Sequence, residues 1–311
     1  MADEFGFHKG DDPAFPNFEE DGGIIDATGI LTYQMVPMGG RRLGIVSGPT
    51  GRACQVVIDA PRTVQFGNRS FKRLGSSGPV VAPPTSDRFI QPLPADLQMT
   101  FEMLPVSVGR TNILLEAAGG GSLASMRASV KSEVKVTISA CRLADLEFVN
   151  KFDDVAIRAA VVRAKTTFKD TANVVLVDDP TIYGVECDIS LGNPVVLGRQ
   201  ITEYNTELST VFRHIVSKTP PAAKLAGIVA IFGWDFELTH QPLVGLNSGR
   251  FCFVEFDPVA RNRNITLEHE IGHAMGLGHT KVRSIMNGEG FNGIERFEAD
   301  DIEILNKSAN P

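Results

Sequence analysis

Short apolar runs separated by turn residues occupy the first half of the chain. The clearest runs, which combine apolar and polar positions as short strands do, are 55–58, 97–103, 112–115 and 134–138. Glycine, serine and proline fill the intervals, for example at 75–79 and 119–121. Short strands at such spacing predict an all-β sandwich over residues 28–145.

From about residue 150 the pattern changes to that of mixed helices and strands. Residues 155–164 have helical spacing, with Arg158, Arg163 and Lys165 on the outer face. A strand, an amphipathic helix, a strand buried on both faces and a last alternating strand are expected at 173–177, 207–218, 225–232 and 249–256. This order predicts an α/β (α+β) domain with a twisted sheet over residues 146–311.

The composition is that of a globular protein and narrows the range of partners. Of the 311 residues, 43% are hydrophobic and 22% are charged, as in an ordinary folded domain. The net charge is −7 without a basic cluster, which argues against nucleic acid as a partner. No apolar run approaches the roughly 20 residues that span a bilayer. Residues 1–27 are acidic and rich in glycine and proline, which predicts a flexible tail.

The compartment and the redox state of the cysteines stay open at this point. The first residues lack the basic and apolar regions of a classical secretion signal, which leaves the cytoplasm or export by a signal-independent route. Four widely spaced cysteines form no CxxC pattern: Cys54, Cys141, Cys187 and Cys252. Buried thiols are expected, and disulfides within each half are the alternative.

Two histidines one helical turn apart begin the pattern that carries chemistry. A helix is expected at residues 265–277, with Thr266 or Asn264 at its N-cap. His269 and His273 are four residues apart on it, so both imidazoles leave the same face. Two nitrogens placed in this way can share one Zn²⁺ at about 2.0–2.1 Å.

Glu270, Gly276 and His279 complete the pattern of a catalytic zinc site. Glu270 directly follows the first histidine and can contact a zinc-bound water without binding the metal. Gly276 can adopt the left-handed conformation that ends a helix, so the chain can turn back and deliver His279 as a third ligand. Three protein ligands leave the fourth position to water, which is typical of a catalytic zinc ion. We expect one such ion per chain.

The segment resembles the zinc-binding signature of the metzincin metallopeptidases, HExxHxxGxxH followed by a Met-turn. The three ligands, the general base and the turn glycine of that signature correspond to His269, His273, His279, Glu270 and Gly276. The Met-turn corresponds to residues 284–287, and Met286 would form an apolar floor beneath the metal. The short link to that turn and a closing helix expected at 297–305 are most similar to the matrixin branch.

The resemblance implies a zinc-dependent endopeptidase acting on a protein or peptide. Zinc would polarise the scissile carbonyl and lower the pKa of its bound water, while Glu270 takes a proton from that water and passes it to the leaving amine. The strand before the zinc helix is the candidate edge for pairing with an extended substrate. The residues expected to contact the substrate are Phe251, Phe253, Asn287 and Gly288.

The sequence also departs from its relatives. Astacin-like and serralysin-like members carry a tyrosine two residues beyond the Met-turn methionine, where this chain has Gly288, so a switching tyrosine ligand is not expected. A PRCGxPD cysteine switch is absent; Cys141 could reach the zinc as an inhibitory thiolate, with burial as the alternative. As in some relatives, Asp178, Asp179 and Asp188 could hold Ca²⁺, with a solvated loop as the alternative.

The sequence does not decide the role of the first half, and several functions of the whole chain therefore stay possible. Residues 108–138 resemble the closing strands of a bacterial Ig-like module, which would be a spacer, a targeting domain or an inhibitory prodomain. One rival function is a toxin or effector peptidase whose N-terminal half binds a secretion machine or the target. A second is an inactive zinc-binding module with an adhesive β domain, against which the intact Glu270 argues.

Overall fold

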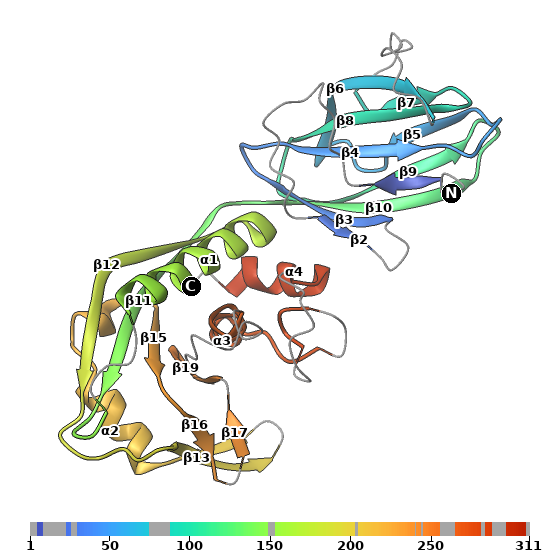
Figure 1. Ribbon diagram of the computed structural model, residues 1–311. Coiled ribbons are helices and arrows are strands. Elements are labelled where there is room, and N and C mark those ends of the chain that lie inside the picture. The colour runs from blue at the N-terminus through green and yellow to red at the C-terminus, as the bar shows by residue number, and fades with distance from the viewer. Residues whose placement is uncertain are drawn as a thin grey trace. The chain divides into compact units, whose positions relative to one another are not determined.

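The computed structural model describes residues 5–8, 23–25, 30–74, 88–148, 153–202, 205–239, 241–243, 245–255, 265–280, 284–287 and 297–308. These residues lie mostly in β-strands of several sheets, together with four α-helices (Figure 1). The chain divides into two compact units. The first comprises residues 1–133 and 170–173, and the second comprises 134–169 and 174–311.

Two β-sheets enclose one core in the first unit. The first sheet has the order β1-β4-β8-β6, with bounds Gly6–His8, Arg42–Ser47, Leu97–Pro105 and Val64–Arg73. The second has the order β2-β3-β10-β9-β5-β7, with bounds Gly23–Ile25, Leu31–Pro37, Ser122–Lys131, Gly109–Ala117, Cys54–Ile58 and Ile90–Leu93. Val46 and Phe101 of the first sheet and Val56 and Ile113 of the second belong to one buried cluster. The predicted all-β sandwich is therefore confirmed for the strands up to β10, which ends at Lys131.

The period of two in the sequence accounts for this packing. On β5 the side chains of Cys54, Val56 and Ile58 are buried, and those between them are partly exposed. Successive side chains of a strand point to opposite faces, so one face joins the core and the other meets solvent.

The prediction of a flexible tail over residues 1–27 is wrong for two short segments. β1 pairs antiparallel with β4, and β2 pairs antiparallel with β3. Phe7 is fully buried in the sandwich core, so its burial outweighs the polar composition around it. Residues 9–22 and 26–29 lie outside the described part of the chain.

The main sheet of the second unit has the order β12-β11-β15-β19-β18. The bounds of these strands, in that order, are Val174–Glu186, Val134–Ala144, Ile228–Gly233, Phe251–Glu255 and Gly245–Ser248. Figure 1 labels β12, β11, β15 and β19 of this sheet. The first four run parallel, and β18 runs antiparallel to β19 at the edge. All six residues of β15 are buried, which confirms the continuous apolar run as a central strand.

A smaller sheet and four helices complete this unit. The sheet has the order β14-β13-β16-β17, with bounds Asn205–Leu208, Val195–Thr202, Phe236–Leu238 and Gln241–Leu243. The helices are α1 Asp154–Ala172, α2 Thr210–Lys218, α3 Thr266–Ala274 and α4 Ala299–Ser308, with a short 3₁₀ turn at Ala223–Leu225. The helix expected from residue 207 begins later, because Ser209 caps α2 and the preceding residues pair with β13.

The boundary between the two units differs from the one expected at 145/146. β11 was expected to close the sandwich, but it lies between β12 and β15 in the main sheet of the second unit. Its apolar pattern is that of any buried strand and does not identify its partners. β11, α1 and β12 form a βαβ unit, which requires the strand before the helix to belong to the same sheet.

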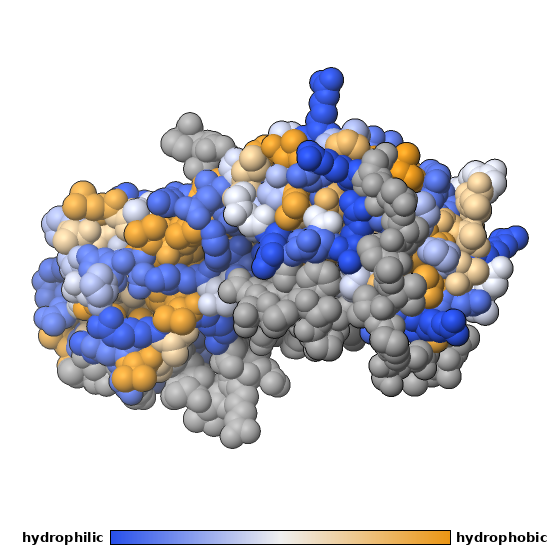
Figure 2. All heavy atoms as spheres, turned by 90° about the horizontal axis from the view of Figure 1, so that it is seen from above, coloured by the Kyte–Doolittle hydropathy of each residue, from blue (hydrophilic) through white to orange (hydrophobic). Residues whose placement is uncertain are grey.

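Among the described residues, no helix is both long enough and apolar enough to span a bilayer. Apolar and hydrophilic residues are interspersed in small groups on the face shown in Figure 2.

Candidate metal centre

Helix α3, which carries His269 and His273, packs against strands β18 and β19 of the main sheet. Its N-cap is Ile265, without a side-chain cap, so the expectation of Thr266 or Asn264 is wrong. The helix ends at Ala274, three residues earlier than expected. Gly276 has φ +92°, its N–H bonds the carbonyl of His273, and the N–H of Leu277 bonds that of Gly272. These two bonds form the Schellman motif that a glycine in the left-handed conformation permits.

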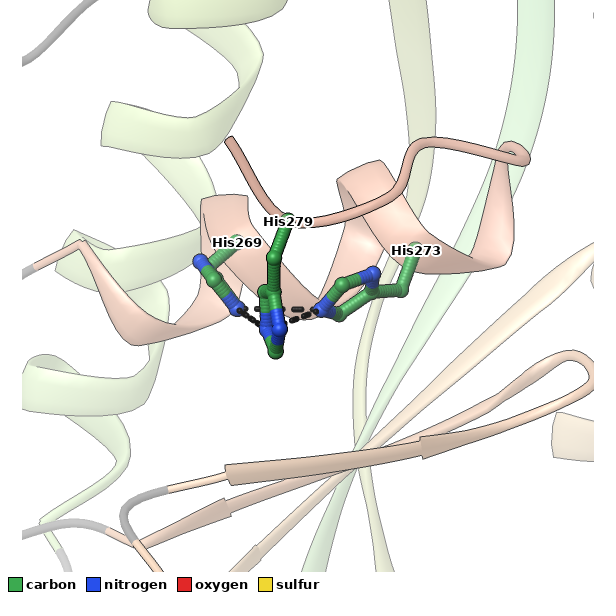
Figure 3. Close-up of side chains that lie close together, drawn as sticks. All are labelled: His269, His273 and His279. Atoms are coloured by element: carbon green, nitrogen blue, oxygen red, sulfur yellow. Dashed lines mark hydrogen bonds between the residues drawn. The ribbon is translucent and has the colours of Figure 1, made fainter. Parts of the chain in front are cut away.

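Three imidazoles converge where the chain turns back (Figure 3). The Nε2 atoms of His269, His273 and His279 lie 3.0, 3.1 and 3.3 Å apart. Ligands of a tetrahedral zinc ion at 2.0–2.1 Å are about 3.3–3.4 Å from one another. His269 is buried and His279 is exposed, so one side of the cluster faces solvent. This triad can hold a metal ion.

Hydrogen bonds on the far side of two rings fix which nitrogen faces the cluster. Nδ1 of His269 lies 2.7 Å from the carbonyl oxygen of Ile285, and Nδ1 of His273 lies 2.8 Å from that of Leu277. A carbonyl oxygen only accepts, so Nδ1 donates, and Nε2 of the neutral ring keeps its lone pair for a cation. Burial lowers the pKa of His269 to about 4 and also lowers that of His273, which keeps both rings neutral.

Glu270, the residue after His269, holds its carboxylate away from water. The residue is buried, burial raises its pKa to about 8, and Oε2 has no hydrogen-bond partner among the described residues. A buried carboxylate is costly unless it is protonated or close to a cation or donor. A cation held by the neighbouring histidines would favour its ionised form.

Gly245 of the edge strand β18 makes room for this carboxylate. A methyl group at Gly245 would overlap Oε1 of Glu270 and lie 2.8 Å from its Cδ atom. The carboxylate therefore lies against the backbone of β18. Sequence reasoning missed this residue, because nothing in the local pattern relates position 245 to position 270.

Met286 packs against helix α3 at Gly272, and its expected place beneath the metal stays a prediction. It is fully buried, and its sulfur lies 2.5 Å from where a methyl group at Gly272 would sit, which is too close for such a group to fit. The adjacent Ile285 provides the carbonyl that holds His269. Gly272 and Ile285 were also missed; the first occupies a variable position of the signature, and the second acts through its backbone.

Ser284 and Asp301 connect this turn to the closing helix α4. The Ser284 hydroxyl accepts the Met286 N–H at 2.9 Å and lies 3.3 Å from Oδ2 of Asp301. The N–H of Thr280 bonds the Met286 carbonyl at 2.9 Å, so the residue after His279 is tied to the same turn. The turn is therefore joined to the third histidine and to α4.

The structure corrects the expected substrate contacts. Phe253 is fully buried between the rings of Phe212 and Phe236, which leaves it no surface for a substrate. Strand β19 is paired with β15 on one side and with β18 on the other, so β18 and not β19 is the edge strand. Phe251 is partly exposed, but it pairs with Ser248, at the opposite end of β18 from Gly245.

Asn287 lies in the turn, where its N–H bonds the Ser284 carbonyl and it pairs with Thr280. Gly288 lies outside the described residues.

The other candidate ligands do not join the centre. Cys141 is fully buried in β11, and burial raises its pKa to about 12, which disfavours a thiolate. All four cysteines are buried free thiols, as expected. Asp178 pairs with Lys165, Asp179 accepts the Tyr183 hydroxyl, and Asp188 pairs with Lys218. Over the described residues, the histidine triad is the cluster suited to a metal, so the three aspartates considered for Ca²⁺ do not form an assembled site there.

Comparisons with known proteins assign no family. No protein-family model matches the chain, and no curated protein does. Solved structures resemble parts of it, and the three described next have TM-scores too low to support an assignment.

The first is the class 5 fimbriae chaperone CfaA, at 14% identity and a TM-score of 0.20, over 33% of this chain and 56% of the chaperone. The second is a PapD-like domain of human CEP192, at 9% and 0.16, over 32% of this chain and 80% of that domain. The third is a family 123 glycoside hydrolase from Clostridium perfringens, at 9% and 0.21, over 65% of this chain and 44% of the hydrolase. The chain thus spans about half the length of the chaperone.

Proposed function

We propose that this protein is a zinc-dependent endopeptidase with His269, His273 and His279 as ligands and Glu270 as general base. The observation that carries the proposal is the convergence of three Nε2 atoms at 3.0–3.3 Å. Glu270, the residue after His269, adds a buried carboxylate oxygen that has no hydrogen-bond partner among the described residues. Three protein ligands and a solvent-facing side are typical of a catalytic rather than a structural zinc site. When bound, zinc would act as a Lewis acid toward a peptide carbonyl and lower the pKa of a water molecule.

Glu270 supplies the proton transfers. Its carboxylate accepts a proton from the attacking water as the new C–O bond forms, and then donates that proton to the leaving nitrogen as the C–N bond breaks. The low-dielectric surroundings of Glu270 strengthen its interaction with the reacting groups. Gly288 stands where some metzincins carry a tyrosine, so we assign no tyrosine donor to the reaction.

The edge strand β18 is the proposed platform for an extended substrate. Its outer edge is not paired with another described strand, and Gly245 on it lies against the Glu270 carboxylate. Pairing of main chains at an edge aligns a peptide without reading its side chains. A substrate aligned there would run beside the base.

The proposed function goes together with a proposed fold family for each unit. We infer a metzincin-like, matrixin-like second unit from the zinc signature and Met-turn, and an Ig-like sandwich from the strand pattern of the first. The sandwich would bind a target or a secretion machine. That arrangement also suits an effector or toxin peptidase, which differs from other peptidases in delivery but not in chemistry.

Metal removal and restoration test the proposal. Protein purified without added metal is expected to contain about one zinc ion per chain, measured by elemental analysis. Chelation should abolish cleavage of an unstructured peptide and lower the unfolding temperature, and added zinc should restore both. Zinc bound without any peptide cleavage would favour the inactive zinc-binding module. Absence of zinc, with no activity on its addition, would contradict the assignment.

A further inference from the structure

Arg163 and Glu268 form an ion pair that joins helix α1 to the zinc-binding helix α3. The Arg163 Nε atom lies 2.7 Å from Oε1 of Glu268, and its Nη2 atom lies 3.5 Å from Oε2. The Glu268 side chain is fully buried, whereas that of Arg163 is 32% exposed. A planar guanidinium that reaches both oxygens of a carboxylate restricts its orientation as well as its position.

Because Glu268 is next to His269 on α3, this ion pair can affect the orientation of the metal centre. Glu268 immediately precedes His269 and lies in the first turn of a helix of nine residues. Side chains of consecutive helical residues are about 100° apart, so fixing Glu268 fixes the directions of His269 and Glu270. The N-cap residue Ile265 provides no side-chain hydrogen bond to hold this end of the helix.

We propose that Arg163 is a positioning residue that acts through Glu268 to set the rotation of α3 about its axis. It therefore determines where His269 aims its Nε2 atom and where Glu270 holds its carboxylate. The inference rests on the proposed function, because it assigns Arg163 a part in that reaction. The metal site itself reports on it independently of catalysis.

The test compares two changes on α1 in the zinc-loaded, full-length protein. Arg163→Gln removes the ion pair. Val161→Ala, two residues earlier, removes buried apolar surface and leaves the pair intact. For each variant, the unfolding temperature and the rate of zinc transfer to a chromogenic chelator are measured, together with the absorption bands of the cobalt-substituted protein.

Arg163→Gln is expected to release zinc at least about tenfold faster than Val161→Ala and to shift the cobalt bands. Arg163→Lys keeps the charge but lacks the planar fork, so its rate of zinc release should lie between those of Arg163→Gln and the native protein. Equal release rates and unchanged cobalt bands in Arg163→Gln and Val161→Ala would show a merely structural role and overturn the proposal.

A double-mutant cycle tests whether the two residues act as one unit. Glu268→Gln alone should accelerate zinc release, and the Arg163→Gln/Glu268→Gln pair should do so by less than the product of the two single effects. Fully multiplicative effects would overturn the proposal. If the native protein holds zinc but cleaves no peptide, the proposed function fails while these rates still decide the role of Arg163. If it cleaves peptides, Arg163→Gln should lower kcat more than it changes KM.

Discussion

The space that the Glu270 carboxylate occupies is left open by Gly245, a residue distant in the sequence. Burial removes the carboxylate from water, and Gly245 allows it to lie directly against the edge strand. A general base is effective when it is held within hydrogen-bonding reach of its proton. The same glycine would bring an extended substrate next to that base.

Gly245→Ala is therefore expected to displace the carboxylate and to reduce peptide turnover by about tenfold or more, while zinc content is retained. Steady-state kinetics and elemental analysis on the same preparation measure the two quantities. Gly184→Ala, on β12 of the same sheet, is the matched control, because a methyl group there comes no closer than 3.5 Å to its neighbours. Equal turnover in both variants would remove Gly245 from the account.

Local spacing predicts some of these residues and misses others for a physical reason. The three histidines, Glu270 and Gly276 are related by helix geometry and by one left-handed turn, which act over a few residues. Gly245 and Gly272 are small because of side chains that arrive from other segments. Phe253 was expected to contact the substrate, but an alternating strand pattern does not reveal which face another ring covers.

The turn at residues 284–287 performs three tasks at once. It packs Met286 against α3, provides the Ile285 carbonyl for His269, and bonds Thr280, the residue after His279. The Ser284 hydroxyl organises this turn from within by accepting the Met286 N–H. Ligand orientation in metal sites depends on such outer hydrogen bonds.

Ser284→Ala should leave the Met286 N–H without this acceptor in a buried position, at a cost of about 1–3 kcal/mol in unfolding free energy. Zinc release should accelerate as well, because the same turn holds His269. Chemical denaturation and chelator kinetics measure the two effects. Ser217→Ala removes an exposed hydroxyl that bonds a helical carbonyl, and it should change neither. A fall in stability without faster zinc release would separate the turn from the metal site.

The order of the strands in the main sheet of the second unit could not be predicted from the sequence. The central strand β15 is recognisable because all its residues are apolar and buried. The edge strand β18, with the sequence Gly-Leu-Asn-Ser, is partly exposed throughout and shows no alternation. The sequence pattern therefore favours β19 as the edge strand, because its alternation is stronger, but β19 is paired with a strand on both sides.

The two units differ in what they contribute to the proposed activity. The residues of the metal centre all belong to the second unit, and β11 at residue 134 is its first strand. β11 lies inside the main sheet, so its removal would expose the edges of both β12 and β15. The first unit, a sandwich with its own core, would direct the enzyme to its target.

A fragment of residues 134–311 is accordingly expected to fold and bind zinc, whereas 146–311, which lacks β11, should not fold. Circular dichroism and zinc analysis distinguish the two fragments. Turnover of a short unstructured peptide by 134–311 should lie within about tenfold of the full-length value, a barrier change below roughly 1.4 kcal/mol. A large increase in turnover on removal of residues 1–133 would identify the sandwich as an inhibitory prodomain.

The most direct test of a zinc-dependent peptidase is mass spectrometry of new peptide termini in a denatured proteome. Zinc-loaded native protein is expected to generate such termini, and a chelator should prevent them. Glu270→Ala keeps all three histidines and should retain zinc, yet it should form these termini about 10²–10⁴ times more slowly. New termini at a similar rate with Glu270→Ala, or none with the zinc-loaded native protein, would contradict the proposed function.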